Sequence, residues 1–497
     1  MDKFVLTEIP HANELTGING IFRDDHLEKN TSPLAERELL HNKIVESLEE
    51  AVRLCGLKDG MTISFHHHFR SGDYIVNMVL DKLAAMGFKD LVVAASSLTD
   101  CHFPMIDHIK NGVIRRIETS GLRGKLAQAV SDGLMDVPVV FRSHGGRAGA
   151  IDKGELPIDV AFLGAPSCDP YGNANGYIRD KDEGIMCGSM GYAKCDAHHA
   201  RKTIIITNHV VHYPNAPFGI PESDVDYIVN VPEIGDPAGI MSGATRFTSN
   251  PKELMIAEMA SKVIFASGRF KPGFSFQTGT GGASLAVTRF LRDQMRAKEI
   301  YASFALGGIT GSIVDLHEEA ARSLRDNRFH QQISAAYYAS PYNEGTAVNQ
   351  LDVVVLSALE ADCNFNVNVL TGADGVIRGA IGGHPDTAFG ASVSIVVVPL
   401  TRGRIPCIVK EVGTVVTPGK SVDVIVTDHG IAVNPLRKNL KKRLRESGLP
   451  VYEIEELQRK AEKLVGVPDP IAFTDKVVGV VTYRDGSVID LIYQIKE

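Results

Sequence analysis

A glycine-rich segment, FQTGTGG at residues 276–282, follows a strand-like stretch and leads directly into the helical pattern ASLAVTRFL. Such a turn presents backbone N–H groups at a helix N-terminus, where the absence of Cβ atoms lets a ligand approach closely. The turn could hold a phosphate group or a developing oxyanion. No lysine or arginine stands where it would reach a terminal phosphate, and GTGGAS is an incomplete GxGxxG, so a nucleotide-hydrolysing P-loop is not expected. The alternative is a βα turn with a structural role only.

A second polar segment is SFHHHFRSGD at residues 64–73, at the end of another predicted strand. Histidine, arginine and serine side chains there could clamp a polycarboxylate through charge-assisted hydrogen bonds. On an extended strand His66 and His68 share a face and His67 points the other way, so the three cannot ligate one metal ion. Packing or solvation of these side chains is the alternative. The residues predicted to contact a carboxylate substrate are His66, His67, His68, Arg70 and Ser71.

Other reactive residue types lack a spacing that points to one chemistry. The segment CGSMGYAKCDAHH (187–199) has neither a CxxC nor closely spaced ligand pairs, and its end is typical of a helix, so no zinc site is predicted. Cys101 and Cys168 could act as nucleophiles beside a histidine, but the sequence does not place such a partner. The glycine-rich run GAIGGHPDTAFGAS (379–392) precedes a strand and could approach a ligand or form a simple turn. The basic helix at 437–445 is either a solvated face or a docking site for an acidic carrier protein.

Short β-branched runs alternate with helical stretches along the chain, which is the rhythm of βαβ units with strands buried on both faces. Apolar residues at 3.6-residue spacing predict an amphipathic helix within 33–55, packed on the body as part of an N-terminal extension. Near the C-terminus, residues 476–495 predict a hairpin that turns at Asp485-Gly486. The predicted strands are 62–65, 91–96, 160–166 and 203–208, and the helices include 74–88, 253–266, 438–448 and 453–464.

The βαβ pattern occurs twice. VAFLGAPSCDPYGNANG (160–176) aligns with VVLSALEADCNFNVNVL (354–370), which places Asp169 over Asp362. Upstream, the 64–83 segment parallels 275–294. We therefore predict an N-terminal extension at 1–60, a first α/β domain at 61–252 and a second at 253–497 that includes the C-terminal helices and hairpin. An active site is expected between the two halves.

The amino-acid composition excludes several classes of protein and partner. Lys plus Arg is 52 and Asp plus Glu is 60, so the net charge is −8 and the pI is near 6.1, which argues against nucleic acid or an anionic membrane as partner. The hydrophobic fraction of 44% is that of an ordinary globular protein. Seven cysteines without dense spacing do not form a disulfide framework, and no signal peptide or membrane span is evident. These features predict a cytoplasmic protein.

Together, the paired segments SCDPYGNANG and EADCNFNVN, the loop FQTGTGGASLAV, the segment AIGGHPD and the closing TPGKSVDVIVTDHGIA resemble the type I CoA-transferase superfamily over nearly the whole chain. The similarity is closest to the citrate lyase alpha subunit family. It implies an α/β fold with two homologous CoA-transferase-like domains, an internal duplication, after the N-terminal helical extension. It also implies a transferase that exchanges citrate for acetate on the thioester of an acyl carrier protein, giving citryl carrier protein and acetate.

The resemblance implies partners and site residues as well. The carrier, gamma, would bear the triphosphoribosyl-dephospho-CoA prosthetic group, a beta subunit would cleave the citryl thioester, and the chain itself would bind no metal or cofactor within a homo-oligomeric, multi-subunit complex. In similar enzymes the oxyanion is held by residues that correspond to Asn368 and Gly383. A loop lies along the CoA-like group, and the matching positions here are Gln277, Thr278, Gly279, Thr280, Gly281 and Gly282.

One departure bears on the mechanism. Relatives that act on free CoA carry a nucleophilic glutamate, and the equivalent stretch here, ALGGITGSIVDL (305–316), has Gly307 at that place. The resemblance therefore implies direct attack of the incoming carboxylate on the acyl thioester, through a mixed anhydride. Two alternatives remain open: a malonate decarboxylase alpha subunit, and a sensor or scaffold without catalysis on the same fold.

Overall fold

The computed structural model describes residues 42–179, 185–241, 248–279, 281–307 and 324–496. The chain divides into two compact units, Met1–Asn42 and Lys43–Glu497, and the second holds every described element. It begins with β1 (Ile44–Val45) and helix α2 (Leu48–Cys55). The Ser47 side chain accepts a hydrogen bond from the Glu50 N–H and starts α2 as an N-cap. The amphipathic helix predicted within 33–55 is therefore present only from Leu48. It is wrong for residues 42–47, where Ile44–Val45 instead pairs with β10 (Tyr227–Asn230) as strand β1, and the part before residue 42 lies outside the described residues.

The first half is built on a sheet in which ten described strands pair. All neighbours are parallel except the last pair, β23 and β24. Every residue of β2 and β6 is buried, as expected for strands covered by helices on both faces. The spatial order is β1, β10 (Tyr227–Asn230), β9 (Lys202–Thr207), β6 (Val160–Ala165), β2 (Thr62–Phe65), β3 (Leu91–Ala95), β4 (Ile114–Thr119), β5 (Val139–Phe141), β23 (Phe473–Thr482) and β24 (Val488–Ile495). The helices include α3 (Ile75–Ala85), α4 (Met105–Lys110), α5 (Gly124–Ser131), α6 (His144–Asp152), α7 (Gly191–His199) and α8 (Pro237–Met241).

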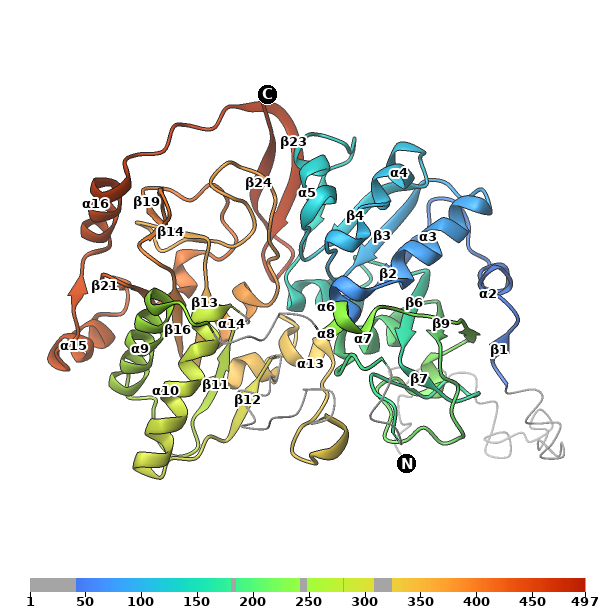
Figure 1. Ribbon diagram of the computed structural model, residues 1–497, viewed down its shortest axis with the longest axis horizontal. Helices are drawn as coiled ribbons and strands as arrows, with labels where there is room; N and C mark the ends of the chain where they lie inside the picture. Colours follow the sequence, from blue (N-terminus) through green and yellow to red (C-terminus); the bar gives the residue numbers. More distant parts are fainter. Residues whose placement is uncertain (1–41, 180–184, 242–247, 280, 308–323, 497) are drawn as a thin grey trace, which may run out of the picture. The chain divides into compact units, whose positions relative to one another are not determined.

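The second half has a sheet of seven described strands (Figure 1). Its order is β12 (Phe304–Leu306), β11 (Ser275–Thr278), β13 (Val353–Ser357), β16 (Val393–Val397), β20 (Val424–Thr427), β21 (Gly430–Val433) and β22 (Val451–Tyr452). Only β20 and β21 are antiparallel among these neighbours. The helices are α9 (Pro251–Ala266), α10 (Gly282–Lys298), α13 (Ala335–Ala339), α14 (His384–Gly390), α15 (Lys438–Glu446) and α16 (Ile454–Val465). The mixed α/β class is confirmed. The predicted strands and the four predicted helices that follow residue 60 each match an element to within a few residues.

The C-terminal hairpin differs from its predicted place. We assigned residues 476–495 to the second half, but β23 pairs with β5 and extends the first sheet. Figure 1 shows the hairpin, in red, beside α5 of the first half. The physical reason is that β5 would otherwise be an open sheet edge, and pairing with β23 satisfies its backbone groups while Val481 and Ile492 enter the core. The chain end therefore ties the two halves together.

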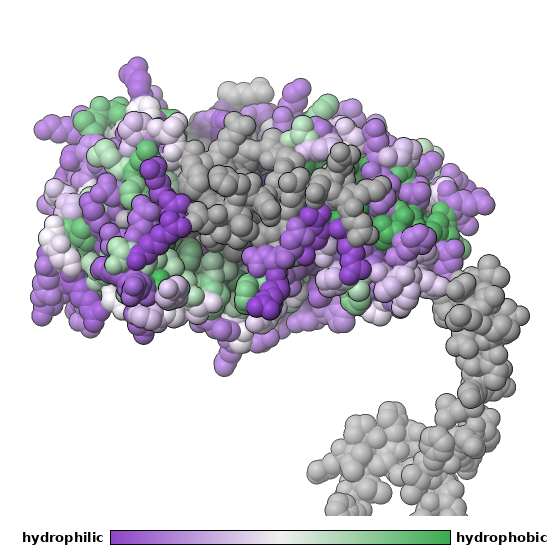
Figure 2. Space-filling view, turned by 60° about the horizontal axis from the view of Figure 1, so that its bottom comes forward, coloured by the Kyte–Doolittle hydropathy of each residue, from purple (hydrophilic) through white to green (hydrophobic). Residues whose placement is uncertain are grey.

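Among the described helices, none combines the length and apolar character needed to cross a bilayer. On the face shown in Figure 2, hydrophilic residues cover much of the described surface and hydrophobic ones are scattered between them.

Candidate functional site

The two halves meet where a turn of the second half, residues 379–383, packs on the ends of strands from the first. The Ile381 N–H donates to the Ser120 carbonyl oxygen at 2.7 Å, and the Leu122 N–H donates to the Gly379 oxygen at 3.2 Å. The His144 N–H, at the start of α6, donates to the Gly382 oxygen at 2.9 Å. Backbone hydrogen bonds in both directions fix the turn of one half against the other, so a site at this junction can be rigid.

Asp386, on α14, strengthens the same junction. Its carboxylate accepts hydrogen bonds from Ser143 Oγ and from the Gly145 N–H, both at 2.9 Å, and Arg484 Nε lies 3.6 Å away. An anion at the N-terminus of α6 is favoured by the helix dipole. Burial nevertheless raises the pKa of Asp386 to about 6, against the effect of these donors. The residue joins α6 of the first half to α14 of the second.

Three aromatic rings gather beside this turn: His67, His144 and Tyr192. The His67 and His144 centroids are 5.9 Å apart with nearly parallel planes, and Tyr192 lies 5.2 Å from His67 and 4.6 Å from His144. Ser96 Oγ holds His67 through both its backbone N–H, at 2.9 Å, and its Nδ1, at 2.7 Å. The cluster combines His67, predicted from sequence, with two residues that the sequence analysis missed.

The rings are uncharged hydrogen-bonding groups at neutral pH. Burial lowers the pKa of His67 to about 4, and the positive charge of Arg70 adds to the effect. Burial also puts the pKa of His144 well below its ordinary value and that of Tyr192 well above. His144 Nδ1 is buried and has no hydrogen-bond partner among the described residues. A buried polar atom without a partner is costly, so this position is suited to a ligand group.

From the second half, Tyr338, Gln277 and Gly383 complete the site. Gln277 Nε2 donates to Tyr338 Oη at 2.8 Å, and a Cβ atom on Gly383 would stand 2.8 Å from the same oxygen. Gln277 Oε1 is buried and unpartnered among the described residues. A Cβ atom on Gly382 would lie 3.5 Å from His144 Nε2, which places the turn against the ring cluster. Gly307, which the resemblance aligns with a glutamate, also lies against Gln277: a Cβ atom on Gly307 would be 2.9 Å from Gln277 Nε2.

In the loop at 277–282, some of the described polar groups form hydrogen bonds within the chain and others do not. Thr278 Oγ1 is buried without a partner among the described residues, whereas the Gly279 N–H donates to the Val355 oxygen at 2.8 Å. A side chain on Gly281 would collide with Ser357 Oγ, and one on Gly282 would stand 2.6 Å from Glu253 Oε2. Close packing thus accounts for two of the glycines. Thr280 lies outside the described residues.

Arg70 and Ser71 lie on the 3₁₀ segment η4 (His67–Gly72). Strand β2 ends at Phe65, so the extended geometry considered for the three histidines does not hold at His67 and His68. Arg70 has a left-handed φ of 53°, and its Nη1 donates to the Ile240 oxygen at 3.3 Å. None of the ion pairs among the described residues involves its guanidinium, which leaves its charge available. Ser71 is exposed. His66 and His68 stack on each other with centroids 3.5 Å apart, away from the ring cluster, so of the three histidines only His67 enters it.

Asn368 is a different case. Its side chain is fully buried: Nδ2 donates to Glu360 Oε1 at 2.9 Å and to the Thr371 oxygen at 3.0 Å, and Oδ1 accepts from the N–H groups of Leu370 and Thr371. Asn368 therefore holds its own turn, and it can contact a ligand only by giving up one of these bonds. Its role in binding an oxyanion stays a prediction.

The aligned aspartates have matching structural roles. Asp169 Oδ2 accepts from Asn173 Nδ2 at 2.9 Å, and Asp362 Oδ2 accepts from Asn366 Nδ2 at 3.1 Å. In each segment Oδ1 accepts backbone N–H groups two and four residues later. The pair shapes two equivalent Asx turns, a geometry that agrees with the predicted duplication.

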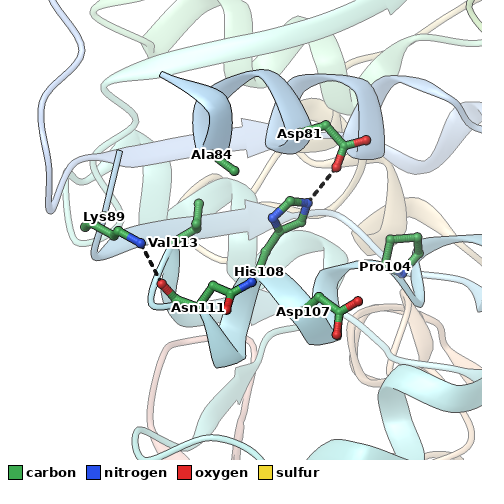
Figure 3. Close-up of a pocket in the computed structure, with 8 residues that line it drawn as sticks. All are labelled: Asp81, Ala84, Lys89, Pro104, Asp107, His108, Asn111 and Val113. Carbon is green, nitrogen blue, oxygen red and sulfur yellow. Dashed lines mark hydrogen bonds and ion pairs between the residues drawn. The ribbon is translucent and has the colours of Figure 1, made fainter. Parts of the chain in front are cut away.

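Other candidate sites are less developed. Within the described ranges no three histidine, cysteine or acidic residues are grouped to hold a metal ion, and the seven cysteines are free. A hollow of about 460 Å³ lies between α3 and α4, away from the junction (Figure 3), where His108 Nε2 and Asp81 Oδ1 are 2.9 Å apart. The basic helix α15 is largely paired within the chain, through Arg437 with Asp423 and through Lys441 and Arg445 with Glu453.

Comparison with known proteins agrees with this arrangement. The family model "Citrate lyase, alpha subunit (CitF)" matches residues 41–495. The citrate lyase alpha chain of Klebsiella pneumoniae is 59% identical over 477 residues, covering 93% of each chain, and that of Escherichia coli (strain K12) is 57% identical over 470 residues, covering 92% of this chain and 91% of that one.

Solved structures agree with the sequence relatives. A structure from Streptococcus mutans, described as the putative alpha subunit of citrate lyase in complex with citrate, has a TM-score of 0.89 and 54% identity, covering 95% of this chain and 93% of that chain. A malonate decarboxylase alpha subunit from Acinetobacter baumannii has a TM-score of 0.58 at 14% identity, covering 87% of this chain and 94% of that chain, so it shares the fold alone. The chain belongs to the citrate lyase alpha subunit family.

Proposed function

We propose that this chain transfers an acyl carrier protein thiol from acetate to citrate: acetyl carrier protein and citrate give citryl carrier protein and acetate. The observation that carries the proposal is the junction between the halves, where His67, His144, Tyr338, Gln277 and Gly383 converge with unpartnered buried polar atoms. Family membership and the citrate named in the Streptococcus mutans structure support citrate as the carboxylate.

The site residues suit binding of a polycarboxylate. His67 and His144 are neutral and can donate hydrogen bonds. The guanidinium of Arg70, which forms no ion pair with a described residue, supplies a positive charge that lowers the pKa of His67. Arg147, by contrast, is committed to Asp196 at 2.6 Å. We assign Arg70 and His67 to citrate binding, with Ser71 at the exposed rim of the same segment.

The reaction follows from carboxylate and thioester chemistry. A citrate carboxylate attacks the acetyl carbonyl, a tetrahedral oxyanion forms, and the thiolate leaves to give a mixed anhydride. The thiolate then attacks the citryl carbonyl and acetate leaves. We assign oxyanion binding to the N–H of Gly383, and the assignment is supported by the fact that no hydrogen bond from this N–H to a described residue is seen. A preorganised donor of this kind lowers the barrier by roughly 3 to 4 kcal/mol.

The partners and compartment belong to the same proposal. The carrier protein with its triphosphoribosyl-dephospho-CoA group would be the thioester substrate, with the loop at 277–282 along that group, and a beta subunit would cleave the citryl product. Since one thioester replaces another, the chain needs no resident metal or redox cofactor. We place the homo-oligomeric chain in a cytoplasmic, multi-subunit complex.

An exchange assay tests the proposal. The purified chain is mixed with an acetyl thioester of a CoA-like thiol and with citrate, citramalate or malonate, and acetate release is measured. We expect release with citrate, and a KM for citrate that rises at least about tenfold in Arg70→Gln with little change in kcat. Arg53→Gln, on the exposed face of α2, is the matched control and should behave as the unaltered chain. Preference for malonate would favour the malonate decarboxylase alternative, and no turnover with any carboxylate would favour the scaffold.

A further inference from the structure

Helices α6 and α7 of the first half carry two of the three rings at the junction, His144 and Tyr192. The ring centroids are 4.6 Å apart. Further along the same two helices, Arg147 of α6 forms an ion pair with Asp196 of α7. Arg147 follows His144 by three residues and Asp196 follows Tyr192 by four, so each charged side chain lies one turn from a ring on the same face of its helix. The ion pair is therefore a contact between α6 and α7 that adjoins the ring cluster.

This ion pair is bidentate and buried. Arg147 Nη1 donates to Asp196 Oδ1 at 2.6 Å, and Arg147 Nη2 donates to Asp196 Oδ2 at 2.8 Å. The two side chains are 2% and 0% exposed. A planar guanidinium that a carboxylate holds at two points has a fixed orientation, which a single contact does not give. The pair thus fixes α6 relative to α7 one turn away from the rings.

The same guanidinium also contacts the sheet. Arg147 Nη2 donates to the Ala94 carbonyl oxygen of β3 at 2.9 Å. Ser96 follows two residues later, and its Oγ contacts both the backbone N–H and Nδ1 of His67. Arg147 is therefore connected to all three rings, through its own helix, through α7 and through β3.

Stability alone does not explain a buried pair of charges at this position. Removing two charges from water costs about as much free energy as their attraction returns, and apolar side chains of similar size often replace such a pair without loss of stability. Arg147 Nε is buried and has no hydrogen-bond partner among the described residues, which adds to the cost. Apolar contacts are not directional, so they cannot supply the fixed orientation that the bidentate pair gives. A physical reason for the charges is the geometry that they impose.

We propose that Arg147 and Asp196 are positioning residues for the carboxylate substrate: their ion pair holds His144 and Tyr192, and through β3 also His67, in the arrangement that binds citrate. The pair acts through the rings, because its charged groups are almost completely buried and already bonded to each other. Citrate as the ligand rests on the proposed function. The effect of the pair on the ring positions does not.

An apolar replacement of the pair separates positioning from stability. The Arg147→Met/Asp196→Leu chain should melt at or above the temperature of the unaltered chain. Its Kd for citrate, measured by isothermal titration calorimetry, should nevertheless rise at least about tenfold, which is the effect of losing one hydrogen bond to a charged ligand group. The kcat/KM for citrate in the acetate-release assay should fall by a similar factor. A pair with a structural role alone predicts normal citrate binding by a variant of normal stability.

A spectroscopic signal reports the ring positions without any ligand. His144 lies edge-on to Tyr192, so the ring current of Tyr192 shifts the imidazole resonance of His144. In a chain that carries isotope-labelled histidine, this resonance is the one missing from the His144→Gln protein. We expect it to move in Arg147→Met/Asp196→Leu. It should move less in Arg147→Lys, which keeps the charge and one contact to the carboxylate but lacks the planar fork.

Asp152→Asn is the matched control. Asp152 and His199 form another contact between α6 and α7, with 3.5 Å between Oδ1 and Nε2, but this contact is partly exposed and lies at the far ends of the helices. The control should leave both the Kd for citrate and the His144 resonance unchanged. Changes in the control as large as those in the apolar variant would assign the effect to helix packing in general and overturn the proposal.

The outcomes are decisive in each direction. An unchanged His144 resonance or an unchanged Kd in the folded apolar variant overturns the proposal. If that variant does not fold, Arg147→Lys decides by the same two measurements, and if neither folds, the pair is needed for the fold itself and the positioning role is rejected.

Failure of the proposed function is distinguishable from failure of this inference. If the unaltered chain binds citrate but releases no acetate, the transferase function fails, while the Kd and the resonance still test the positioning role. If the unaltered chain does not bind citrate, the His144 resonance alone decides whether the pair sets the ring positions.

Discussion

Replacing Gly383 by alanine should impair catalysis more than folding. Gly383 has φ −93° and ψ 16°, a conformation open to any residue, so backbone strain does not require glycine here. The obstacle is Tyr338: the added Cβ would lie 2.8 Å from Oη and 3.2 Å from Cε1. Tyr338 must move, and the 2.8 Å hydrogen bond from Gln277 Nε2 is then lost.

The structure predicts different magnitudes for the effect of Gly383→Ala on folding and its effect on catalysis. Leaving the buried Gln277 donor unpaired costs about 1 to 3 kcal/mol of folding free energy, which lowers the melting temperature by a few degrees. If the Gly383 N–H holds the oxyanion, displacing the turn should also reduce kcat by about a hundredfold or more. Calorimetry and the acetate-release assay on one preparation give both numbers.

A double variant distinguishes a ligand-binding turn from a turn that merely packs. Tyr338→Phe removes the atom nearest to the new methyl group. Adding Gly383→Ala to the Tyr338→Phe protein should therefore lower the melting temperature much less than adding it to the unaltered chain. Its exchange rate should stay low, because the path of the ligand to the Gly383 N–H is still altered. A double variant that recovers both stability and rate would refute the assignment of Gly383 to the oxyanion.

Three further outcomes are expected. Borohydride and hydroxylamine trapping under turnover should leave every Asp and Glu unmodified, because the proposed mechanism has no glutamate nucleophile and the resemblance puts Gly307 at its place; a stoichiometric adduct on any carboxylate would contradict this. EDTA and dialysis should not reduce exchange by the isolated chain, and loss of activity restored by zinc or magnesium would oppose the metal-independent mechanism. Burial lowers the pKa of His67 and His384 to about 4, so on acidification the unfolded chain takes up these protons before the folded chain does, and the melting temperature should fall as the pH decreases from about 6.5 towards 4. Burial raises the pKa of Asp386 to about 6, which opposes part of this change. A melting temperature that rises on acidification would contradict the assignment.

The periodic features of the sequence were sufficient to predict most elements. Strands such as 62–65 and 160–165 are short, largely apolar runs in which every residue is buried, and this composition indicates burial on both faces. The hairpin at the C-terminus was also predicted, but the sheet that it joins was not. Strands β5 and β23 pair although more than three hundred residues separate them in the sequence. The local sequence of either strand does not indicate which strand it pairs with.

Part of the site could also be predicted from local sequence composition. His67, Gln277 and Gly383 lie in segments with unusual local composition and could be found by it. His144, Tyr192 and Tyr338 acquire their roles only through long-range packing, although SHGG at 143–146 is a signal of the same kind as the glycine runs and could have been noticed. Asn368 illustrates the converse, because its place in a motif does not reveal that its amide is already committed within the chain.

The change at Gly307 and the presence of Gln277 are best understood together. Gly307 has φ +92°, a conformation that side chains rarely adopt, and a Cβ there would approach Gln277 Nε2 and Cδ at 2.9 and 3.0 Å. The space that a glutamate would need is thus occupied by Gln277, which in turn orients Tyr338 beside Gly383. A glutamate at this position would displace the end of the Gln277 side chain, and with it the hydrogen bond from Gln277 Nε2 to Tyr338 Oη.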